Sequence, residues 1–457
     1  LDLGSTRFKL GLLRADGSLE IIATEPAPVL RGTGLVREGE PSEFLSVATR
    51  LIDHAAQRWP DLPLGLVSQR STFTVWDVQS GTALIPMISW QDRRAAQWCA
   101  RHRELDSTIA THSGLLLSPH YLGPKLASIL QDPATGPDLT ERLRDGSACT
   151  GTLDTWLTWH WSLPHQHQTD LTMAARTALA DIEFSDWSTE LCAVFGIPRQ
   201  ALPSIRPTNE QRLDLRNGLR LTTCIADQAA GAGAVLEPDD NVALVNFGTG
   251  AFVLYPHADA QLRRAGYLTA PVLLPGSGKP WFVLEGTING AGPALDRFFE
   301  GPSELPIEDD CPEGFAIPDL AGIGAPHWRE DIGLTLSPAA QSAAPQIKRR
   351  IVLEGLLFRV LEILTDVNDG QPPERVLISG GVVRDPGVAL GLAQLLDKPV
   401  GQLAERETTL LGAARLAAGW SAYSNPEVRE ITATRAGAYL PDKYQRWRTW
   451  FAQELGR

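Results

Sequence analysis

Hydrophobic and polar positions alternate near the start of the chain, where Phe8, Leu10 and Leu12 recur at every second residue. This period of two is typical of a strand that buries one face. Asp16-Gly17, which follows, favours a hairpin turn. The opening therefore predicts a strand, a tight turn, a second strand, a turn and a third strand.

The tight turn between the first two strands is Gly4-Ser5-Thr6. Its glycine lets the backbone approach a ligand closely, and its amides and hydroxyls can form an anion-binding nest. Asp-x-Gly-Ser/Thr is a weak motif by itself, and a purely structural hairpin would carry the same residues. The design returns over residues 242–254, where Gly248-Thr249-Gly250 separates two apolar strands. Two such hairpins predict an internal duplication with one sheet in each half.

Helical and extended segments alternate over the rest of the chain. Strands are expected at 64–69, 221–226 and 376–379. Apolar spacing and terminal signals predict helices at 43–59, 125–130, 351–367 and, as the final helix, 408–418, with a further helix beginning at 186–188. Gly380-Gly381 follows the last strand, where a flat base could lie against bare backbone, although a tight turn explains the pair equally well.

The centre of the sequence carries an acid where a strand is expected to end. The apolar run 221–226 leads into Asp227 and Gln228, and residues 229–233 are all very small. A strand would deliver the carboxylate to its exposed end, and the small residues would let another segment pack behind it. A loop acid beside a helix start is the simpler alternative. We interpret Asp227 as a catalytic base that faces a nucleotide.

Composition narrows the class of protein. A chain of 457 residues is too long for one ordinary core and predicts two large domains. The net charge of −13 argues against general nucleic-acid binding. The absence of GxxxxGK[ST] and of a well-placed GxGxxG argues against P-loop and Rossmann sites. No apolar run is long enough for a membrane span, and no signal peptide is visible.

The cysteines and the start of the chain support two further expectations. The five cysteines are scattered without metal-ligand spacing, which favours reduced, mostly buried thiols in a cytosolic protein. The sequence begins at Leu1, within a predicted strand and without Met, so we expect a few residues upstream.

Taken in order, these motifs resemble the FGGY carbohydrate kinases, within the superfamily of sugar kinases, Hsp70 and actin-like ATPases. The resemblance covers essentially the whole chain. It rests on Asp2–Lys9 and Asn246–Gly250 as phosphate motifs, Asp227 as the catalytic Asp, Ser379–Asp385 as adenosine loop, and the supporting stretches 90–94, 168–177 and 411–414. The resemblance implies an α/β fold of two duplicated actin-like (ribonuclease H-like) domains, residues 1–234 and 235–457, with a nucleotide cleft between them.

The resemblance also implies a site. ATP would contact Gly4, Ser5, Thr6, Lys9, Gly248, Thr249, Gly292, Gly380, Gly381 and Asp385. Mg²⁺ would lie between the phosphates and the carboxylates of Asp2 and Asp227. Asp227 would take the proton from the attacking hydroxyl of a small sugar or polyol. The resemblance also allows a homodimer.

The acceptor-contact stretches are most similar to those of glycerol kinases, with Arg70, Trp90 and Gln228 as matching residues. Ser71 stands where glycerol kinases have Glu, and His120 stands where they have a phenol. These changes remove a charged acceptor and a hydroxyl donor, and buried hydrogen-bond patterns control which substrates a pocket accepts. We therefore expect a longer polyol or a ketose rather than glycerol.

Asp385 is a further departure, because the family usually has Asn there and an ionised Asp can only accept hydrogen bonds. The expectation is weaker binding or discrimination of ATP. Two alternatives stay open: a xylulokinase-like or gluconate-kinase-like enzyme, and a nucleotide-binding regulator that keeps the fold without turnover. A chaperone-type ATPase is disfavoured, since no separate peptide-binding β-domain is visible.

Overall fold

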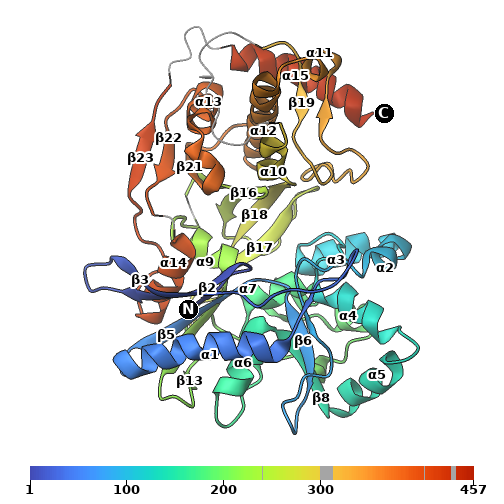
Figure 1. Ribbon diagram of the computed structural model, residues 1–457, viewed down its shortest axis with the longest axis vertical. Coiled ribbons are helices and arrows are strands. Elements are labelled where there is room, and N and C mark those ends of the chain that lie inside the picture. The colour runs from blue at the N-terminus through green and yellow to red at the C-terminus, as the bar shows by residue number, and fades with distance from the viewer. Residues whose placement is uncertain (239, 299–311, 406, 434–438, 457) are drawn as a thin grey trace.

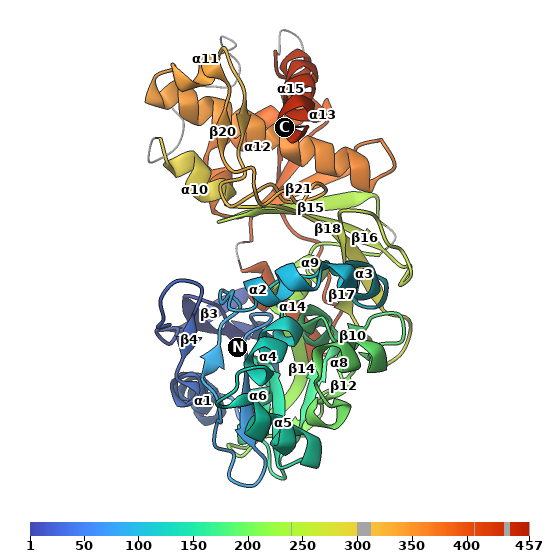
Figure 2. The same ribbon diagram turned by 90° about the vertical axis from the view of Figure 1, so that its right-hand side faces the viewer.

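The computed structural model describes residues 1–238, 240–298, 312–405, 407–433 and 439–456. The protein is a mixed α/β molecule of two domains, each built on its own sheet. In Figure 1 the N-terminal domain lies below and the C-terminal domain above, and the view turned by 90° in Figure 2 shows the same stacking.

A six-stranded sheet in the order β13-β14-β5-β1-β2-β3 lies in the N-terminal domain. β14, β5 and β1 run parallel, and β2 and β3 continue the sheet in antiparallel pairing. The strands are β1 (Asp2–Leu3), β2 (Arg7–Leu13), β3 (Leu19–Pro26), β5 (Pro63–Ser68), β13 (Leu213–Asp214) and β14 (Arg220–Ala226). β2 buries Phe8, Leu10 and Leu12, which confirms the predicted alternation.

The seven-stranded sheet of the C-terminal domain repeats this plan in the order β17-β18-β16-β15-β21-β22-β23. Its hairpin β15-β16 is continued by antiparallel β18, while β21 and β22 run parallel to β15. The strands are β15 (Val242–Phe247), β16 (Ala251–His257), β17 (Leu268–Leu273), β18 (Trp281–Ile288), β21 (Arg375–Ser379), β22 (Val400–Leu403) and β23 (Val428–Ile431). The hairpin with two parallel neighbours therefore occurs twice, as the duplication predicts.

Long helices cover these sheets. α1 (Pro41–Arg58) begins with Pro41 behind a capping Glu40 and buries one face that includes Phe44 and Leu51. α12 (Pro345–Val367) is buried along most of its length, so the one-sided pattern expected for 351–367 understates its burial. α13 (Pro386–Leu396) and the last helix, α15 (Leu440–Leu455), pack against each other.

Shorter elements complete the domains. Shorter α-helices of the described residues include α2 (Ala96–Arg101), α3 (Asp106–Ser113), α4 (Leu122–Leu130), α5 (Gly136–Asp145), α6 (Leu153–Trp161), α7 (Leu171–Ala174), α8 (Thr189–Phe195), α9 (Asp227–Gly233), α10 (Ala291–Asp296) and α11 (Pro338–Gln341). β4 (Glu38–Gly39), β7 (Met87–Ile88), β6 (Phe73–Asp77) and β8 (Ala148–Thr152) form a four-stranded sheet. The small pairs are β9 (Gln168–Asp170) with β12 (Ser204–Arg206), β10 (Ala180–Asp181) with β11 (Asp186–Trp187), and β19 (Ala316–Ile317) with β20 (Thr335–Leu336).

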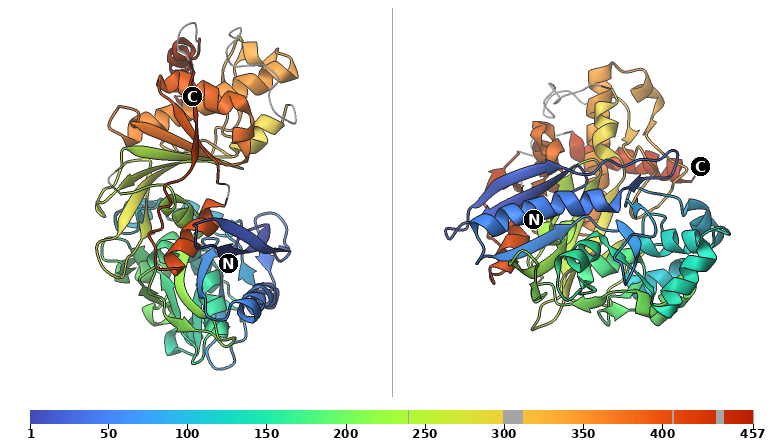
Figure 3. Two further views of the ribbon diagram at one scale, coloured as in Figure 1. Left: turned by 90° about the vertical axis from the view of Figure 1, so that its left-hand side faces the viewer. Right: turned by 60° about the horizontal axis from the view of Figure 1, so that its bottom comes forward.

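One helix of the second half belongs spatially to the first domain. α14 (Thr408–Ala417) lies against α9, β5 and β14, although β22 before it and β23 after it are in the C-terminal sheet. The left view of Figure 3 shows this helix in the N-terminal domain. The chain thus passes from the C-terminal domain to the N-terminal domain and back.

Two predictions of local structure are wrong. Residues 186–187 form β11 rather than a helix start, and the side chain of Ser188 caps α8 by accepting a hydrogen bond from the Leu191 amide. The helix at 408–418 is not the final one, because α15 follows it.

Cys99, Cys149, Cys192 and Cys224 are buried free thiols, while Cys311 lies outside the described residues. In the part of the chain that the structure describes, no helix combines the length and the apolar character needed to cross a membrane.

Candidate active site

Asp227 lies at the edge where the parallel strands of the N-terminal sheet end. It follows β14 directly and is the first residue of α9. Strand register places Ala226 beside Ser68, and Ser68 beside Leu3, so the carboxyl ends of β14, β5 and β1 meet there. The Asp227 side chain is 41% exposed, and its Oδ1 accepts a hydrogen bond of 2.9 Å from the Gln228 amide. This position leaves the carboxylate accessible to a ligand.

The small residues behind Asp227 make room for α14. A Cβ built on Gly231 would lie 3.4 Å from the hydroxyls of Thr408 and Thr409. A Cβ on Gly412 of α14 would lie 2.3 Å from the carbonyl oxygen of Ala230. The close packing anticipated from the sequence is therefore packing of α9 against α14.

Asp2 lies near Asp227 at the same sheet edge. Burial, and after it the negative charge of Asp227, raises the pKa of Asp2 to about 7. Two carboxylates that repel each other suit a hard cation such as Mg²⁺, which commonly uses one or two carboxylates and takes its other ligands from phosphate and water. No cluster of three or more His, Cys, Asp or Glu side chains among the described residues could hold a metal ion.

Lys9, expected at the nucleotide, is paired with an acid from the second half of the chain. Its Nζ lies 2.7 Å from each carboxylate oxygen of Glu407, the residue just before α14. This contact brings a charged group of the α14 segment to the first phosphate turn.

Both predicted phosphate turns connect hairpin strands. Gly4 is required in the first one, because a Cβ there would lie 2.8 Å from the carbonyl oxygen of Arg7, while Ser5 and Thr6 are exposed. In the second turn the Gly248 amide donates to the Gly250 carbonyl at 2.8 Å.

Gly292 lies directly against the second turn. Its amide donates to the Thr249 carbonyl at 3.2 Å, and a Cβ there would lie 2.7 Å from the Gly248 carbonyl oxygen. The structure thus brings Gly292 together with Gly248 and Thr249, from which it is distant in sequence.

The expected adenosine loop begins beside this turn. Strand register places Ser379 beside Asn246, and Gly380 has a φ of 98° with its Cα close to the Phe247 carbonyl. Gly381 is exposed, and a Cβ there would meet no atom within 4 Å. Bare backbone is therefore available at Gly381.

Asp385 is buried and engaged with the protein. One carboxylate oxygen accepts from the Gly387 amide at 3.0 Å, which caps α13, and the other lies 3.1 Å from Nη2 of Arg349. From sequence, Asp385 was expected at the adenine as an ionised acid that can only accept hydrogen bonds. The structure instead gives it a cationic partner.

Arg70 lies between two carboxylates. Its Nε is 3.5 Å from Oδ1 of Asp227, and its Nη1 is 3.7 Å from Oε2 of Glu285. Burial, followed by the nearby positive charge of Arg176, lowers the pKa of Arg70. The structure thus brings Arg70 together with Asp227.

Ser71 and Trp90 adjoin this region. Ser71 is buried, and its backbone is in the left-handed region with a φ of 61°. Its hydroxyl donates to the Arg176 carbonyl at 2.7 Å. The Trp90 ring is on the surface, and its amide donates to the Thr72 hydroxyl at 3.0 Å. Position 71 therefore contributes a hydroxyl that is already used by the backbone.

His120 is tied to Trp90 through one ring nitrogen. Nδ1 lies 3.2 Å from the Trp90 carbonyl oxygen, and because a carbonyl can only accept, Nδ1 carries the hydrogen. Burial lowers the pKa of His120, which favours the neutral ring. In this tautomer Nε2 is a hydrogen-bond acceptor, the opposite of a donating phenol.

Sequence reasoning missed Glu285 and gave no role to Arg176 or Tyr121. Glu285 is on β18 of the C-terminal domain, and its side chain is 3% exposed. Its Oε2 contacts Nη2 of Arg176, and the side chain of Tyr121 is a further neighbour of the Arg176 guanidinium. The signal was a lone acid within the apolar strand 281–288, since buried carboxylates require partners.

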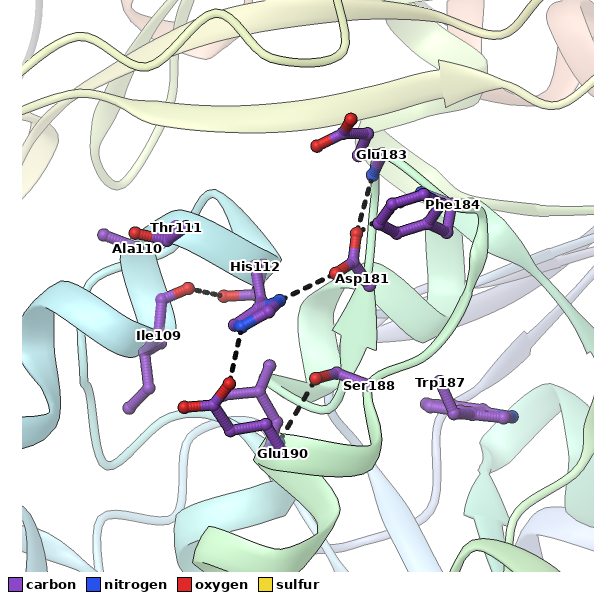
Figure 4. Close-up of polar contacts among 12 residues, drawn as sticks. Ile109, Ala110, Thr111, His112, Asp181, Glu183, Phe184, Trp187, Ser188 and Glu190 are labelled. Carbon is purple, nitrogen blue, oxygen red and sulfur yellow. Dashed lines mark hydrogen bonds and ion pairs between the residues drawn. The ribbon is translucent and has the colours of Figure 1, made fainter.

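A second polar cluster lies between α3, β10 and α8 (Figure 4). His112 is held by two carboxylates, with Nδ1 2.7 Å from Oδ2 of Asp181 and Nε2 3.1 Å from Oε2 of Glu190. Hydrogen bonding, first to Asp181 and also to Glu190, raises the pKa of His112. Arg263 of the C-terminal domain donates to the carbonyls of Ala110 and Thr111 on the same helix, at 3.0 Å each. The cluster secures α3 and includes none of the predicted site residues.

Comparison with known proteins gives consistent matches over both domains. Residues 1–228 match the FGGY family of carbohydrate kinases, N-terminal domain, and residues 243–420 match its C-terminal domain. A glycerol kinase of Xanthobacter autotrophicus is 30% identical over 448 residues, which cover 91% of this chain and 88% of that protein.

Two solved structures show the same fold. Glycerol kinase of Plasmodium falciparum with ADP has a TM-score of 0.86 at 21% identity, over 99% of this chain and 97% of that one. Ligand-bound xylulose kinase of Lactobacillus acidophilus has a TM-score of 0.83 at 18% identity, over 100% and 98% of the two chains.

Proposed function

The chain belongs to the FGGY family of carbohydrate kinases, ATP-dependent phosphotransferases with an alcohol group as acceptor, and we propose that its acceptor is a ketose or a polyol other than glycerol. The observation that carries this proposal is the state of Ser71. As a serine, position 71 has no carboxylate to accept from an acceptor hydroxyl. The Ser71 hydroxyl itself already donates to the Arg176 carbonyl. When a binding site lacks a buried hydrogen-bonding group, the set of substrates that it binds changes strongly.

His120 supports the same proposal. Its neutral ring presents an accepting Nε2, so it would pair with an acceptor group that donates a hydrogen bond. Arg70 supplies donors from the other side of the proposed site, and Trp90 an exposed ring for the carbon chain. Such a set fits a substrate that carries more than one hydroxyl along its chain.

Asp227 would act as the general base. Its carboxylate is accessible and lies near Arg70, which would also bind the acceptor. The residue itself directly follows a strand of the N-terminal sheet. It would accept the proton of the attacking hydroxyl as this oxygen adds to the γ-phosphoryl group. Phosphoryl transfer of this kind depends mainly on positioning and on compensation of charge.

Asp2 and Asp227 are the residues that would hold Mg²⁺, since their mutual repulsion would be relieved by a cation. The ion would neutralise charge on the phosphate oxygens. The backbone of both phosphate turns would receive these oxygens, with the adenosine near Gly380 and Gly381.

A coupled assay of ADP release across glycerol, tetritols, pentitols, xylulose, ribulose and gluconate tests the proposal. We expect the highest kcat/KM with a ketose or a longer polyol, and turnover lower by about 10²-fold or more with the Asp227→Asn variant. Glycerol as the best acceptor would contradict the substrate assignment. Absence of turnover with every acceptor would favour the nucleotide-binding regulator.

A further inference from the structure

Four residues near the acceptor site form a closed chain of contacts through both domains. The Ser71 hydroxyl donates to the Arg176 carbonyl, and Nη2 of Arg176 contacts Oε2 of Glu285. The same oxygen of Glu285 lies 3.7 Å from Nη1 of Arg70, the residue next to Ser71. The C-terminal domain contributes Glu285 to this chain, and the N-terminal domain contributes the other members.

Glu285 is an unusual residue for its place in the sheet. It lies on β18 between β16 and β17, where register places it beside Leu254 and Leu268. A carboxylate removed from water destabilises the fold unless it is well paired. Its partners are two guanidinium groups of the other domain, Arg70 and Arg176. The paired charges therefore depend on the docking of β18 onto the N-terminal domain.

The space around these charges is small. A cavity of about 10 Å³ lies where the domains meet, lined by Arg70, Arg176 and Gln228 on one side and by Thr269 and Val283 on the other. The Arg70 side chain borders this cavity and is 21% exposed, and its two nearest counter-charges are Asp227 and Glu285.

The distances show how Arg70 is shared. Asp227 and Glu285 lie 3.5 Å and 3.7 Å from its nitrogens, both longer than an ordinary charged hydrogen bond. Each carboxylate thus attracts the guanidinium without holding it closely. Without the charge of Glu285, attraction would draw Arg70 toward Asp227.

We propose that Glu285 is a positioning residue of the acceptor site: from the C-terminal domain it holds Arg70 away from a close ion pair with Asp227. In this position the Arg70 N–H groups can donate to acceptor hydroxyls, and the Asp227 carboxylate stays accessible. The inference rests on the proposed function in taking Arg70 as an acceptor ligand. It adds that the acceptor site is complete only when β18 is docked.

Steady-state kinetics of Glu285→Gln test this role. We expect the KM for the best acceptor to rise about tenfold or more, because a charged hydrogen bond to the acceptor is lost, while the KM for ATP stays within about twofold. Glu285→Asp keeps the charge and should restore part of the acceptor affinity. Equal KM values in wild type and Glu285→Gln would overturn the proposal.

Glu362→Gln is a matched control. Glu362 is also a carboxylate of the C-terminal domain that pairs with an arginine, Arg359. Its Oε1 lies 2.9 Å from Nε2 of His327. Its loss should lower the unfolding temperature and leave both KM values unchanged. A rise in acceptor KM for this control as large as that for Glu285→Gln would show a general structural effect and contradict the inference.

A crystal structure of Glu285→Gln gives a readout independent of turnover. We expect Arg70 to move into a hydrogen bond with Asp227, with an N···O distance of about 2.9 Å. An unmoved Arg70 would refute the positioning role even if the wild type phosphorylates none of the acceptors, so the two proposals can fail separately. If Glu285→Gln does not fold, Glu285→Asp replaces it: an intermediate rise in acceptor KM is expected, and a wild-type KM contradicts the role.

Discussion

At the scale of single residues, the proposed general base Asp227 is the first position to test. Replacing it with Asn keeps the size of the side chain and removes the base, so turnover should fall by about 10²–10⁴-fold or more. ATP affinity should change little, because the phosphate turns and the Gly380 loop are unaffected. Coupled kinetics and calorimetric titration of ATP measure the two effects.

Asp53→Asn is a suitable control for this variant. Asp53 is on α1, and its Oδ1 accepts a hydrogen bond of 3.0 Å from Asn217, remote from the sheet edge of Asp227. Near-normal turnover of Asp227→Asn would remove its assignment as base.

Asp385 leads to a different prediction from the one that its sequence alone suggests. Because Arg349 compensates its charge, we expect the wild type to prefer ATP to GTP and Asp385→Asn to keep this preference. The variant should instead lose about 1–3 kcal/mol of stability, since Arg349 loses a buried partner. Nucleotide titrations and chemical unfolding check both points. A gain in ATP affinity in Asp385→Asn would restore the earlier interpretation.

At the scale of elements, the His112 cluster should make stability depend on pH. The pKa of His112 is raised above 6.5 by Asp181 and Glu190, so the cluster stabilises the fold fully below about pH 6.5 and loses this contribution as pH rises through the folded-state pKa. The unfolding temperature of His112→Gln should therefore fall furthest below wild type near pH 5.5 and approach it near pH 8.5. A partly exposed pair contributes about 1 kcal/mol or less. A gap that does not vary with pH would contradict this account.

Sequence patterns predicted the elements whose signals are local. The hairpin around Gly248 and helix α1 were predicted, because two apolar runs separated by glycines and the spacing of apolar residues along a helix are local signals. α15 was missed because Lys443 interrupts its apolar stripe. The structure buries this ammonium beside Glu354 of α12, a partner that no local pattern could supply.

The residues of the candidate site also fall into two groups, those with a local sequence signal and those without one. Asp227 and the glycine turns were predicted from strand ends and from φ-permissive residues. Glu285 was not, because its role depends on which residues of the other domain face β18. The engagement of Asp385 by Arg349 was also beyond the sequence, since α12 and α13 meet only in the folded protein.

At the scale of the whole molecule, α14 connects the domains through close backbone packing. Gly412→Ala would place a Cβ 2.3 Å from the Ala230 carbonyl oxygen, so α14 and α9 must separate. We expect a loss of about 1–3 kcal/mol of stability and a lower kcat, since α9 begins with Asp227, the proposed base. Unfolding and coupled kinetics measure these effects.

Gly456→Ala is the matched control for this substitution, because its Cβ would lie 3.5 Å from the Ala452 carbonyl oxygen, an ordinary contact. A Gly412→Ala variant that is as stable and as active as Gly456→Ala would contradict the close fit.

The passage of α14 into the N-terminal domain also has a consequence for biosynthesis. When the first 234 residues have emerged from the ribosome, the strands of the first sheet have been synthesised. The helix that packs against β5 and β14, α14, has not. Gly65 of β5 packs closely against Ala413 of α14, since a Cβ at position 65 would lie 2.7 Å from the Ala413 carbonyl oxygen. This contact cannot form before α14 has been synthesised. The first domain to emerge is therefore among the last to be finished, and its exposed apolar face is available to chaperones until nearly the whole chain has been translated.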